Sequence, residues 1–329
     1  MTTGVDRTPG ANPLMIAVAL GIVYVVWGST YLAIRVVVRD LPATSSASWR
    51  YFVAAILLGA ILCARGGLGR LRATPRELAG CAFVGLCLPA LGNGLVSVGE
   101  SHGAPSGVAA LLVAAVPLWV IVYRAVTGDL PGSRTTLGVV LGFGGLLLLI
   151  ASSGFGGAIK VGPCLVIMVA TVFWSFGSWS TPRLTLPKDA FVLTAYEMLF
   201  GSFWLLAISA IRGEHMLPTS APAEAWWAWV YLVTFGSVVA FTAYVWVLSA
   251  APISLVATYA YVNPVVAVFL GWLILSEPVT LPIVIGGGIV VAAVAIVVAA
   301  ERPARRQSAP TPNPEPESAP ESAPEPATT

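Results

Sequence analysis

Long apolar runs with almost no charge follow one another along most of this chain, and they constrain the fold more than any other feature. Breaks rich in polar residues, glycine and proline separate ten such runs, each about 17–25 residues long, the length at which a helix crosses a bilayer. We expect helices at residues 14–38, 43–64, 77–98, 105–127, 135–152, 160–181, 190–211, 225–247, 253–275 and 281–300. The sequence therefore predicts an all-α polytopic membrane protein with ten transmembrane helices.

The composition excludes most other classes. Of the 329 residues, 57% are hydrophobic and only 10% are charged, whereas a soluble domain carries about 25% charged residues. The net charge of +2 comes without a basic cluster, so we expect no nucleic-acid partner. The 4 cysteines are scattered through apolar runs without CxxC spacing, which predicts neither a disulfide framework nor a metal site. We expect no cofactor.

The ends of the chain and its basic residues predict an orientation. The first apolar run is too long for a signal peptide and should remain as a helix. With the N-terminus inside, twelve of the 17 Lys and Arg residues lie on the inner side, three on the outer side and two within helices. This bias predicts a multi-pass cell-membrane protein with both termini in the cytoplasm. The N-terminal segment is 1–13, and the Pro/Glu/Ser-rich tail 301–329 is predicted to be disordered.

An internal repeat appears when the chain is shifted by 147 residues. At this offset Trp27 coincides with Trp174, and Pro117 coincides with Pro264. We therefore divide the chain into two five-helix repeats, 14–152 and 153–300. An odd number of helices per copy makes the two copies enter the membrane from opposite sides. Inverted-topology repeats of this kind are typical of secondary transporters.

Three stretches resemble a known family. "WGSTYLAIRVVVRDLPATSSASWRYFVAAILL" resembles the start of the EamA-type repeat of the drug/metabolite transporter superfamily, "APSGVAALLVAAVPLWV" its fourth helix, and "SLVATYAYVNPVVAVFLGWLILSEPVT" its ninth helix and the following turn. The resemblance implies a ten-helix carrier of small organic molecules, often an exporter of amino acids or drug-like compounds. The second copy departs from the pattern with "WSFGS" in place of Trp-Gly-Ser, and with Glu where the first copy has Arg.

Those two charged residues, Arg50 and Glu197, coincide at the same 147-residue offset. Each lies about 12 Å into a hydrocarbon core of about 30 Å, where an unpaired charge costs about 2.5–3.5 kcal/mol. Arg50 either binds a substrate carboxylate or phosphate, or ties the fold to Glu197, Glu100 or free carbonyl groups. Glu197 is the candidate for proton coupling, and a permanently paired or lumen-facing carboxylate is its structural alternative.

Further polar and aromatic side chains inside the predicted helices are candidates to line a cavity for an amphipathic solute. They are Trp27, Thr30, Tyr31, Asn93, Trp174, Ser178, Thr258, Tyr259, Tyr261 and Asn263. Their alternative roles are hydrogen bonding between helices and, for the tryptophans, anchoring at the membrane surface. Pro117 and Pro264 should kink the fourth and ninth helices.

The function predicted from these features is secondary transport of a small molecule by alternating access, with export favoured and proton coupling through Glu197. An uptake carrier, an exchanger and a membrane receptor or scaffold are the alternatives. We expect no enzyme, because the chain has 2 histidines and no G-x-S-x-G or H-E-x-x-H motif. The partners are then the lipid bilayer and a small-molecule substrate. Glycine runs in the fifth and tenth helices predict close packing within one chain, or a homodimer seam.

Overall fold

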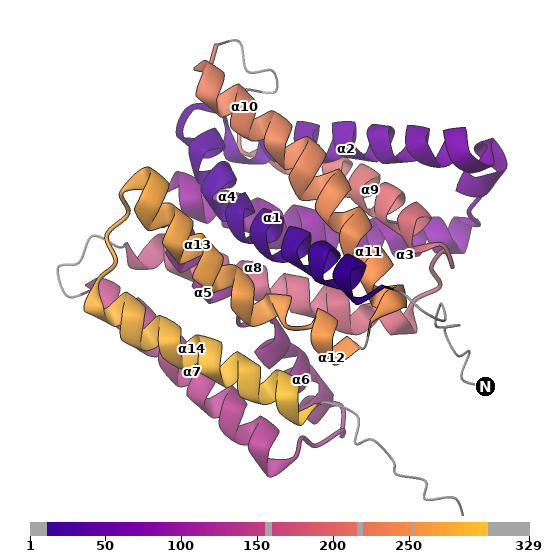
Figure 1. Ribbon diagram of the computed structural model, residues 1–329. Coiled ribbons are helices and arrows are strands. Elements are labelled where there is room, and N and C mark those ends of the chain that lie inside the picture. The colour runs from indigo at the N-terminus through magenta and orange to yellow at the C-terminus, as the bar shows by residue number, and fades with distance from the viewer. Residues whose placement is uncertain (1–11, 155–159, 216–219, 252, 302–329) are drawn as a thin grey trace, which may run out of the picture.

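The structure, a computed structural model, describes residues 12–154, 160–215, 220–251 and 253–301 (Figure 1). The described chain is helical and contains no strand. Most of the predicted N-terminal segment and nearly all of the predicted disordered tail lie outside the described residues. The elements that form the ten predicted crossings are α1 (Pro13–Asp40), α2 (Ala43–Gly66), α3 (Pro75–Gly85) with η2 (Leu86–Asn93) and α4 (Gly94–Ser101), α5 (Ser106–Val113) with α6 (Val116–Val126), α7 (Ser133–Gly154), α8 (Val161–Ser180), α9 (Ala190–Ile211), α10 (Ala223–Tyr231) with η4 (Leu232–Val239) and α11 (Ala240–Ala250), α12 (Ile253–Val256) with α13 (Tyr259–Leu275), and α14 (Leu281–Ala300).

The predicted ten-helix architecture is confirmed. Nine helical stretches within the described residues are long and apolar enough to cross a membrane, and the shorter apolar helix α13 completes the set. The predicted bounds differ from the observed ones by only a few residues. We call the side where α1 begins the N-terminal face and the side where it ends the opposite face. Because the crossings alternate in direction, α2, α5, α8, α10 and α14 all begin on the opposite face.

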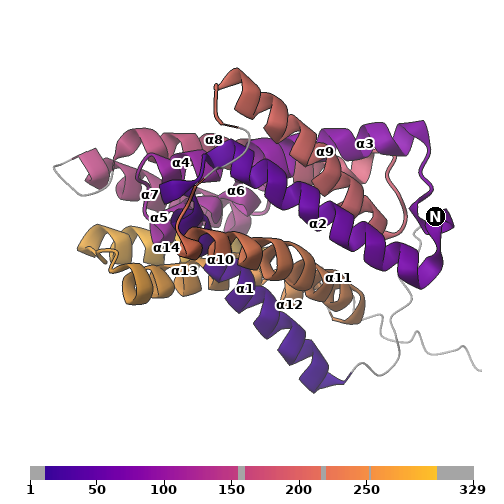
Figure 2. The ribbon, with the colours of Figure 1, turned by 90° about the horizontal axis from the view of Figure 1, so that it is seen from above.

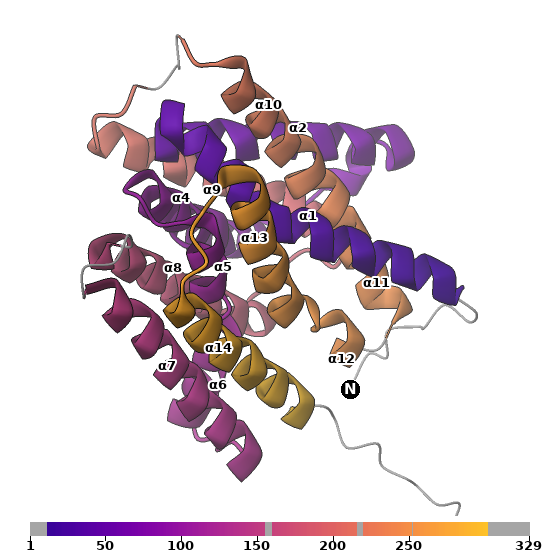
Figure 3. The ribbon, with the colours of Figure 1, turned by 60° about the vertical axis from the view of Figure 1, so that its left-hand side comes forward.

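The packing of the helices follows the repeat. In the first repeat α2 is the second crossing, and it packs along α9, its counterpart in the second repeat. The fifth and tenth crossings, α7 and α14, likewise lie side by side along their lengths (Figures 1 and 3). Figure 2 shows α2 and α9 along one side of the molecule, with α13 and α14 on another. The two repeats therefore interleave, so that space at the centre is bordered by both.

The glycine runs of α7 and α14 pack against each other, as predicted for close contact within one chain. A Cβ added to Gly145 would come within 3.0 Å of the Gly286 carbonyl oxygen, and one added to Gly286 within 3.1 Å of the Gly145 carbonyl oxygen. Small residues let the two backbones approach this closely and gain dispersion contacts that lipid chains cannot supply. These glycines fix the distance between the fifth and tenth crossings.

Four crossings are interrupted, in two matched pairs. The third contains the π-helix η2 and the eighth contains the π-helix η4, at corresponding places in the two repeats. In η2, Pro89 has no N–H to donate to the preceding turn. In η4, the Thr234 hydroxyl donates to the Val230 carbonyl at 2.8 Å, which competes with the regular backbone pattern. A π-helical turn inside a longer helix is often found at a functional site.

The fourth and ninth crossings are broken, but the two breaks differ in position. The fourth is interrupted at Ala114 and Ala115, and Pro117 then occupies the first turn of α6, where no N–H is needed. The ninth is interrupted before Tyr259, whereas Pro264 lies inside the continuous helix α13. Pro264 was predicted to kink the ninth helix, and the interruption of this crossing lies upstream of it, before α13 begins. The Thr258 hydroxyl donates to the Leu255 carbonyl at 2.5 Å and supports the break instead.

Candidate functional site

A cavity of about 300 Å³ lies at the centre of the bundle, bordered by helices of both repeats. On most first-repeat helices its lining residues lie nearer the opposite face, as Arg50 and Ala110 do. On most second-repeat helices they lie nearer the N-terminal face, as Ser178 and Thr194 do. This distribution is what two inverted copies around one central site would produce.

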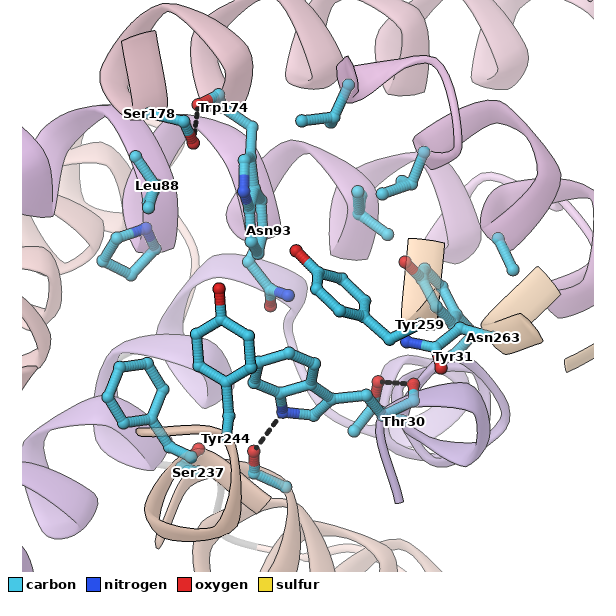
Figure 4. Close-up of a pocket in the computed structure, with 18 of the residues that line it drawn as sticks. Thr30, Tyr31, Leu88, Asn93, Trp174, Ser178, Ser237, Tyr244, Tyr259 and Asn263 are labelled. Atoms are coloured by element: carbon cyan, nitrogen blue, oxygen red, sulfur yellow. Dashed lines mark hydrogen bonds between the residues drawn. The ribbon is translucent and has the colours of Figure 1, made fainter. Parts of the chain in front are cut away.

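Most of the residues proposed from the sequence border this cavity. Those that line it are Trp27, Thr30, Tyr31, Arg50, Asn93, Pro117, Trp174, Ser178, Glu197, Tyr259, Asn263 and Pro264. Figure 4 shows Asn93, Trp174, Tyr244 and Tyr259 pointing into the same space. Thr258 and Tyr261, which were expected beside them, are placed elsewhere. Thr258 hydrogen-bonds the Tyr24 hydroxyl, and Tyr261 packs against the apolar core.

Trp27 and Trp174, the pair related by the repeat, both border the cavity. The Trp27 Nε1 donates to the Gly236 carbonyl oxygen at 3.3 Å, which holds the indole against η4. Trp174 packs against Gly92 of η2, where an added Cβ would lie only 2.7 Å from the indole ring. Each tryptophan of one repeat is therefore seated on the π-helix of the other repeat.

Arg50 is held by neutral groups. The residue is 5% exposed. Its Nε donates to the Ser237 hydroxyl at 3.1 Å, and its Nη1 donates to the Asn93 Oδ1 at 3.4 Å. Its guanidinium carbon lies 4.8 Å from the centre of the Tyr51 ring. None of the ion pairs among the described residues includes Arg50.

The two π-helices place the partners of Arg50. Asn93 ends η2, and Ser237 lies within η4. The guanidinium thus reaches one neutral acceptor from each interrupted crossing. These two hydrogen bonds orient the Arg50 guanidinium without neutralising its positive charge. An anionic group that enters the cavity would therefore meet a desolvated and preorganised hydrogen-bond donor.

Glu197 supplies the opposite charge in the same cavity. It lies on α9, is half-buried and borders the cavity together with Arg50. No ion pair within the described part of the chain joins the two residues. A direct tie between Arg50 and Glu197 was one alternative predicted from the sequence, but the two residues share a cavity without pairing in the described part of the chain.

Four neighbouring aromatic rings form an apolar wall. Trp27 lies 5.0 Å from Tyr244, 5.3 Å from Tyr259 and 6.5 Å from Phe241, measured between ring centres. Tyr244 and Tyr259 meet edge to face at 5.7 Å, a favourable arrangement for aromatic pairs. The cavity can therefore accept an apolar or aromatic group beside two separated charges.

Several lining residues were missed from the sequence. Tyr51, Ser237, Phe241 and Tyr244 border the cavity. Tyr51 follows Arg50 directly, and the run "FTAYVW" in the eighth crossing carries three aromatic residues and a threonine, which could have been recognised. Ser237 gave no such signal, since one serine in an apolar helix is most often hydrogen-bonded to its own backbone.

On the opposite face, Glu214 links the two repeats outside the membrane-spanning segments. Its Oε2 accepts hydrogen bonds from the Thr44 N–H at 3.0 Å, the Thr44 hydroxyl at 2.7 Å and the Ser45 N–H at 3.0 Å. Arg212 pairs with Oε1 at 3.0 Å. Burial raises the pKa of this carboxyl, but the hydrogen bonds from Thr44, Ser45 and Arg212 outweigh that effect and hold the pKa below its usual range. Glu214 thereby caps α2 from the other repeat.

Comparison with known proteins identifies the family. The EamA-like transporter family matches residues 14–151 and again residues 162–299. The chain is 37% identical to the "Uncharacterized inner membrane transporter YedA" of Escherichia coli K12 over 77% of its length and 80% of that protein. It is 28% identical to the "Probable terminal-alkyne amino-acid exporter" of Streptantibioticus cattleyicolor over 89% of its length and 96% of that protein.

A solved structure titled "Crystal structure of protein" has the same fold. It superposes with a TM-score of 0.60 at 18% sequence identity, over 88% of this chain and 100% of the other. The two matched regions cover nearly all ten crossings described above. The chain belongs to the EamA-like transporter family and is a membrane transporter with the family domain present twice.

Proposed function

We propose that the protein is a secondary carrier in the cell membrane that exports a small amphipathic metabolite, such as an amino acid or a drug-like compound, by alternating access. The observation that carries this proposal is a central cavity lined by both inverted repeats, with Arg50 and Glu197 on its wall. Two pseudo-symmetric halves around one site can exchange inward-open and outward-open arrangements of similar energy.

The cavity chemistry favours a solute with an anionic group and an apolar or aromatic group. In this assignment the Arg50 fork binds a carboxylate or phosphate, and the rings of Trp27, Tyr244 and Tyr259 contact the apolar part. Glu197 binds either a cationic group of the solute or a proton that competes with it. The same carboxylate would in this way link solute movement to the proton gradient.

The direction and the orientation are parts of the proposal. Export is supported by the amino-acid exporter among the relatives. Cytoplasmic termini are supported by the bias of Lys and Arg toward the N-terminal face. With this orientation the N-terminal face is cytoplasmic, and the caps formed by Glu214 lie on the outer side.

The test is ligand-induced stabilisation of the purified protein. A panel of amino acids, nucleosides and cationic drugs is screened for an increase in the melting temperature, since a ligand at 100 times its Kd stabilises the folded state by about 2.7 kcal/mol. The carboxylate-bearing hits are then compared in Arg50→Lys. We expect about tenfold weaker binding because lysine keeps the charge but loses the bidentate fork.

The control is Arg39→Lys, since Arg39 is exposed at the end of α1 and does not border the cavity. It should bind the hits as the wild type does. Equal affinity of Arg50→Lys and the wild type for every hit would refute the assigned role of Arg50. A complete absence of stabilising solutes would count against a small-molecule site in this cavity.

A further inference from the structure

Glu100 is a buried acid that the proposed transport site does not use. It lies near the C-terminal end of α4, close to the opposite face, with 0% of its side chain exposed. Neither carboxyl oxygen has a hydrogen-bond partner among the described residues. Nearly all buried polar groups in proteins are hydrogen-bonded, and an ionised carboxylate without partners is very costly to bury.

The nearest cation does not neutralise this carboxyl. Arg35 of α1 lies close by, but its Nη1 donates to the backbone carbonyl oxygen of Glu100. No ion pair within the described residues joins Arg35 to the Glu100 carboxylate. In this arrangement Glu100 is accommodated far better as a neutral acid than as an anion.

A second carboxylate, that of Glu277, lies near Glu100. It joins the ninth crossing to the fourth. Its Oε1 accepts from the Ser106 N–H at 2.9 Å, and its Oε2 accepts from the Ser106 hydroxyl at 2.9 Å and from the Gly107 N–H at 3.3 Å. The first turn of α5 is thus capped by the segment that follows α13. The negative charge of Glu277 is favourable at this position, because the N-terminus of α5 is the positive end of its helix dipole.

The backbone around Glu277 is shaped for this cap. Ser276 adopts the left-handed conformation, with a φ of 53°, and turns the chain back toward α13. Gly271 leaves room for the carboxylate, since an added Cβ there would lie 2.5 Å from the Glu277 Oε2. On α5, Ala110 lines the cavity one turn below Ser106. The cap therefore closes the bundle between the cavity and the opposite face.

The elements packed against α4 carry further titratable groups besides Arg35. They are Tyr24, Tyr31, Arg39 and Asp40 on α1, Arg50, Tyr51, Cys63 and Arg65 on α2, Cys87 in η2, and Cys164 on α8 with the exposed Lys160 at its start, while α5 has none. His102, just beyond α4, is exposed. Arg35 and Glu277 are the charged groups that act on Glu100. A negative charge on Glu100 would repel the nearby Glu277 and weaken the cap on α5.

From this geometry we infer that Glu100 is a proton-binding site whose occupation holds the opposite face closed. The inference rests on the alternating-access function proposed above. When the ends of α5 and α13 separate, water reaches the carboxyl, which then ionises at neutral pH as an ordinary glutamic acid does. Because the closed form binds the proton and the open form releases it, lowering the pH favours the closed form.

The test measures the opening directly and needs no solute. The four native cysteines are replaced by alanine, and spin labels are attached through His102→Cys and Val279→Cys, on either side of the α5 cap. The replacement of His102 also removes the only histidine near Glu100. Distances between the labels are then measured by double electron–electron resonance in liposomes from pH 5 to pH 9.

We expect the distance distribution of this background to shift from short to long as the pH rises. Glu100→Gln should remain at the short distance throughout, because the amide cannot ionise. Glu277→Gln removes both a repelling charge and the cap, so its transition should move about one unit toward lower pH. Glu214→Gln is the control, because it alters a helix cap on the same face but away from Glu100. It should keep the pH-dependent change in distance.

Two results would overturn the inference: a distance that does not change with pH in the background, or a Glu100→Gln variant that follows the background transition. Either result leaves the proposed function intact, since solute binding and exchange are measured separately. Conversely, if no solute is bound or exchanged while the distances titrate as expected, the proposed function fails and the proton site is supported.

Discussion

Neutralising Glu214 tests how the two repeats are held together on the opposite face. In Glu214→Gln the side chain keeps its shape, but the charge that strengthens the three hydrogen bonds from Thr44 and Ser45 is lost. Hydrogen bonds to a charged group contribute about 1.5–3 kcal/mol each and neutral ones about 0.5–1.5 kcal/mol, and a helix cap contributes about 0.5–2 kcal/mol. Because the amide still accepts some of these bonds, we expect a net loss of about 1–2 kcal/mol.

The loss of stability in Glu214→Gln should depend on pH, and it should become smaller as the pH falls. The folded-state pKa of Glu214 is lowered, so its contribution is complete above the unfolded value of about 4.3 and is lost as the pH falls through the folded value. In detergent, unfolding followed by tryptophan fluorescence should give a melting temperature roughly 2–5 °C lower for the variant at pH 7. Below the folded-state pKa the difference should disappear.

Asp40→Asn is the matched control for this measurement, since Asp40 is an exposed acid at the end of α1 on the same face. It should change the melting temperature little at either pH. Equal melting temperatures of Glu214→Gln and the wild type at pH 7 would refute the reasoning. So would a deficit of the same size at pH 7 and at low pH, because it would show that the charge is not the cause.

Three further changes test other parts of the account. Glu197→Gln should abolish solute accumulation driven by a pH gradient in proteoliposomes while solute exchange continues, and an unchanged response to the gradient would reject Glu197 as the coupling group. Gly145→Ala should reduce the free energy of unfolding by about 1–3 kcal/mol and so lower the melting temperature, because its Cβ would meet Ile289 at 2.9 Å, whereas Gly144→Ala has no neighbour within 4 Å and should be neutral or stabilising. Ser237→Ala removes the acceptor of the Arg50 Nε and should weaken binding of anionic hits with little change in the melting temperature; normal binding would show that Ser237 does not position Arg50.

The crossings and the repeat could be predicted because a bilayer leaves few solutions. A helix must satisfy its own backbone in lipid, so the length and hydropathy of each run locate it to within a few residues. The same rule does not say where a crossing bends. Pro117 follows a break because it lies in the first turn of α6, whereas α13 continues through Pro264 and the break of the ninth crossing lies at Thr258.

The charged part of the site was found from the sequence, and much of its surroundings was not. Arg50 and Glu197 stand out because charge is rare in apolar helices, and both border the cavity. Ser237 and Tyr244 reach it because of the π-helix η4 and the helix rotation beyond it. Helical periodicity from the sequence assumes 3.6 residues per turn, so a π-helical stretch changes which side chains face inward. By i+3 and i+4 spacing Thr258 and Tyr261 lie on a helix face adjacent to that of Tyr259 and Asn263, and of the four only Tyr259 and Asn263 are among the residues that border the cavity.

Counterflow in proteoliposomes tests the central claim most directly. Purified protein is reconstituted into vesicles loaded with an excess of an unlabelled solute that stabilises it, and labelled solute is added outside without any ion gradient. A carrier with one alternating site predicts transient accumulation of label above equilibrium, which is absent from protein-free vesicles. Entry of label that only approaches equilibrium, unaffected by the solute inside, would indicate a channel and contradict the account. No entry of a solute that the protein binds would indicate a receptor and would contradict it equally.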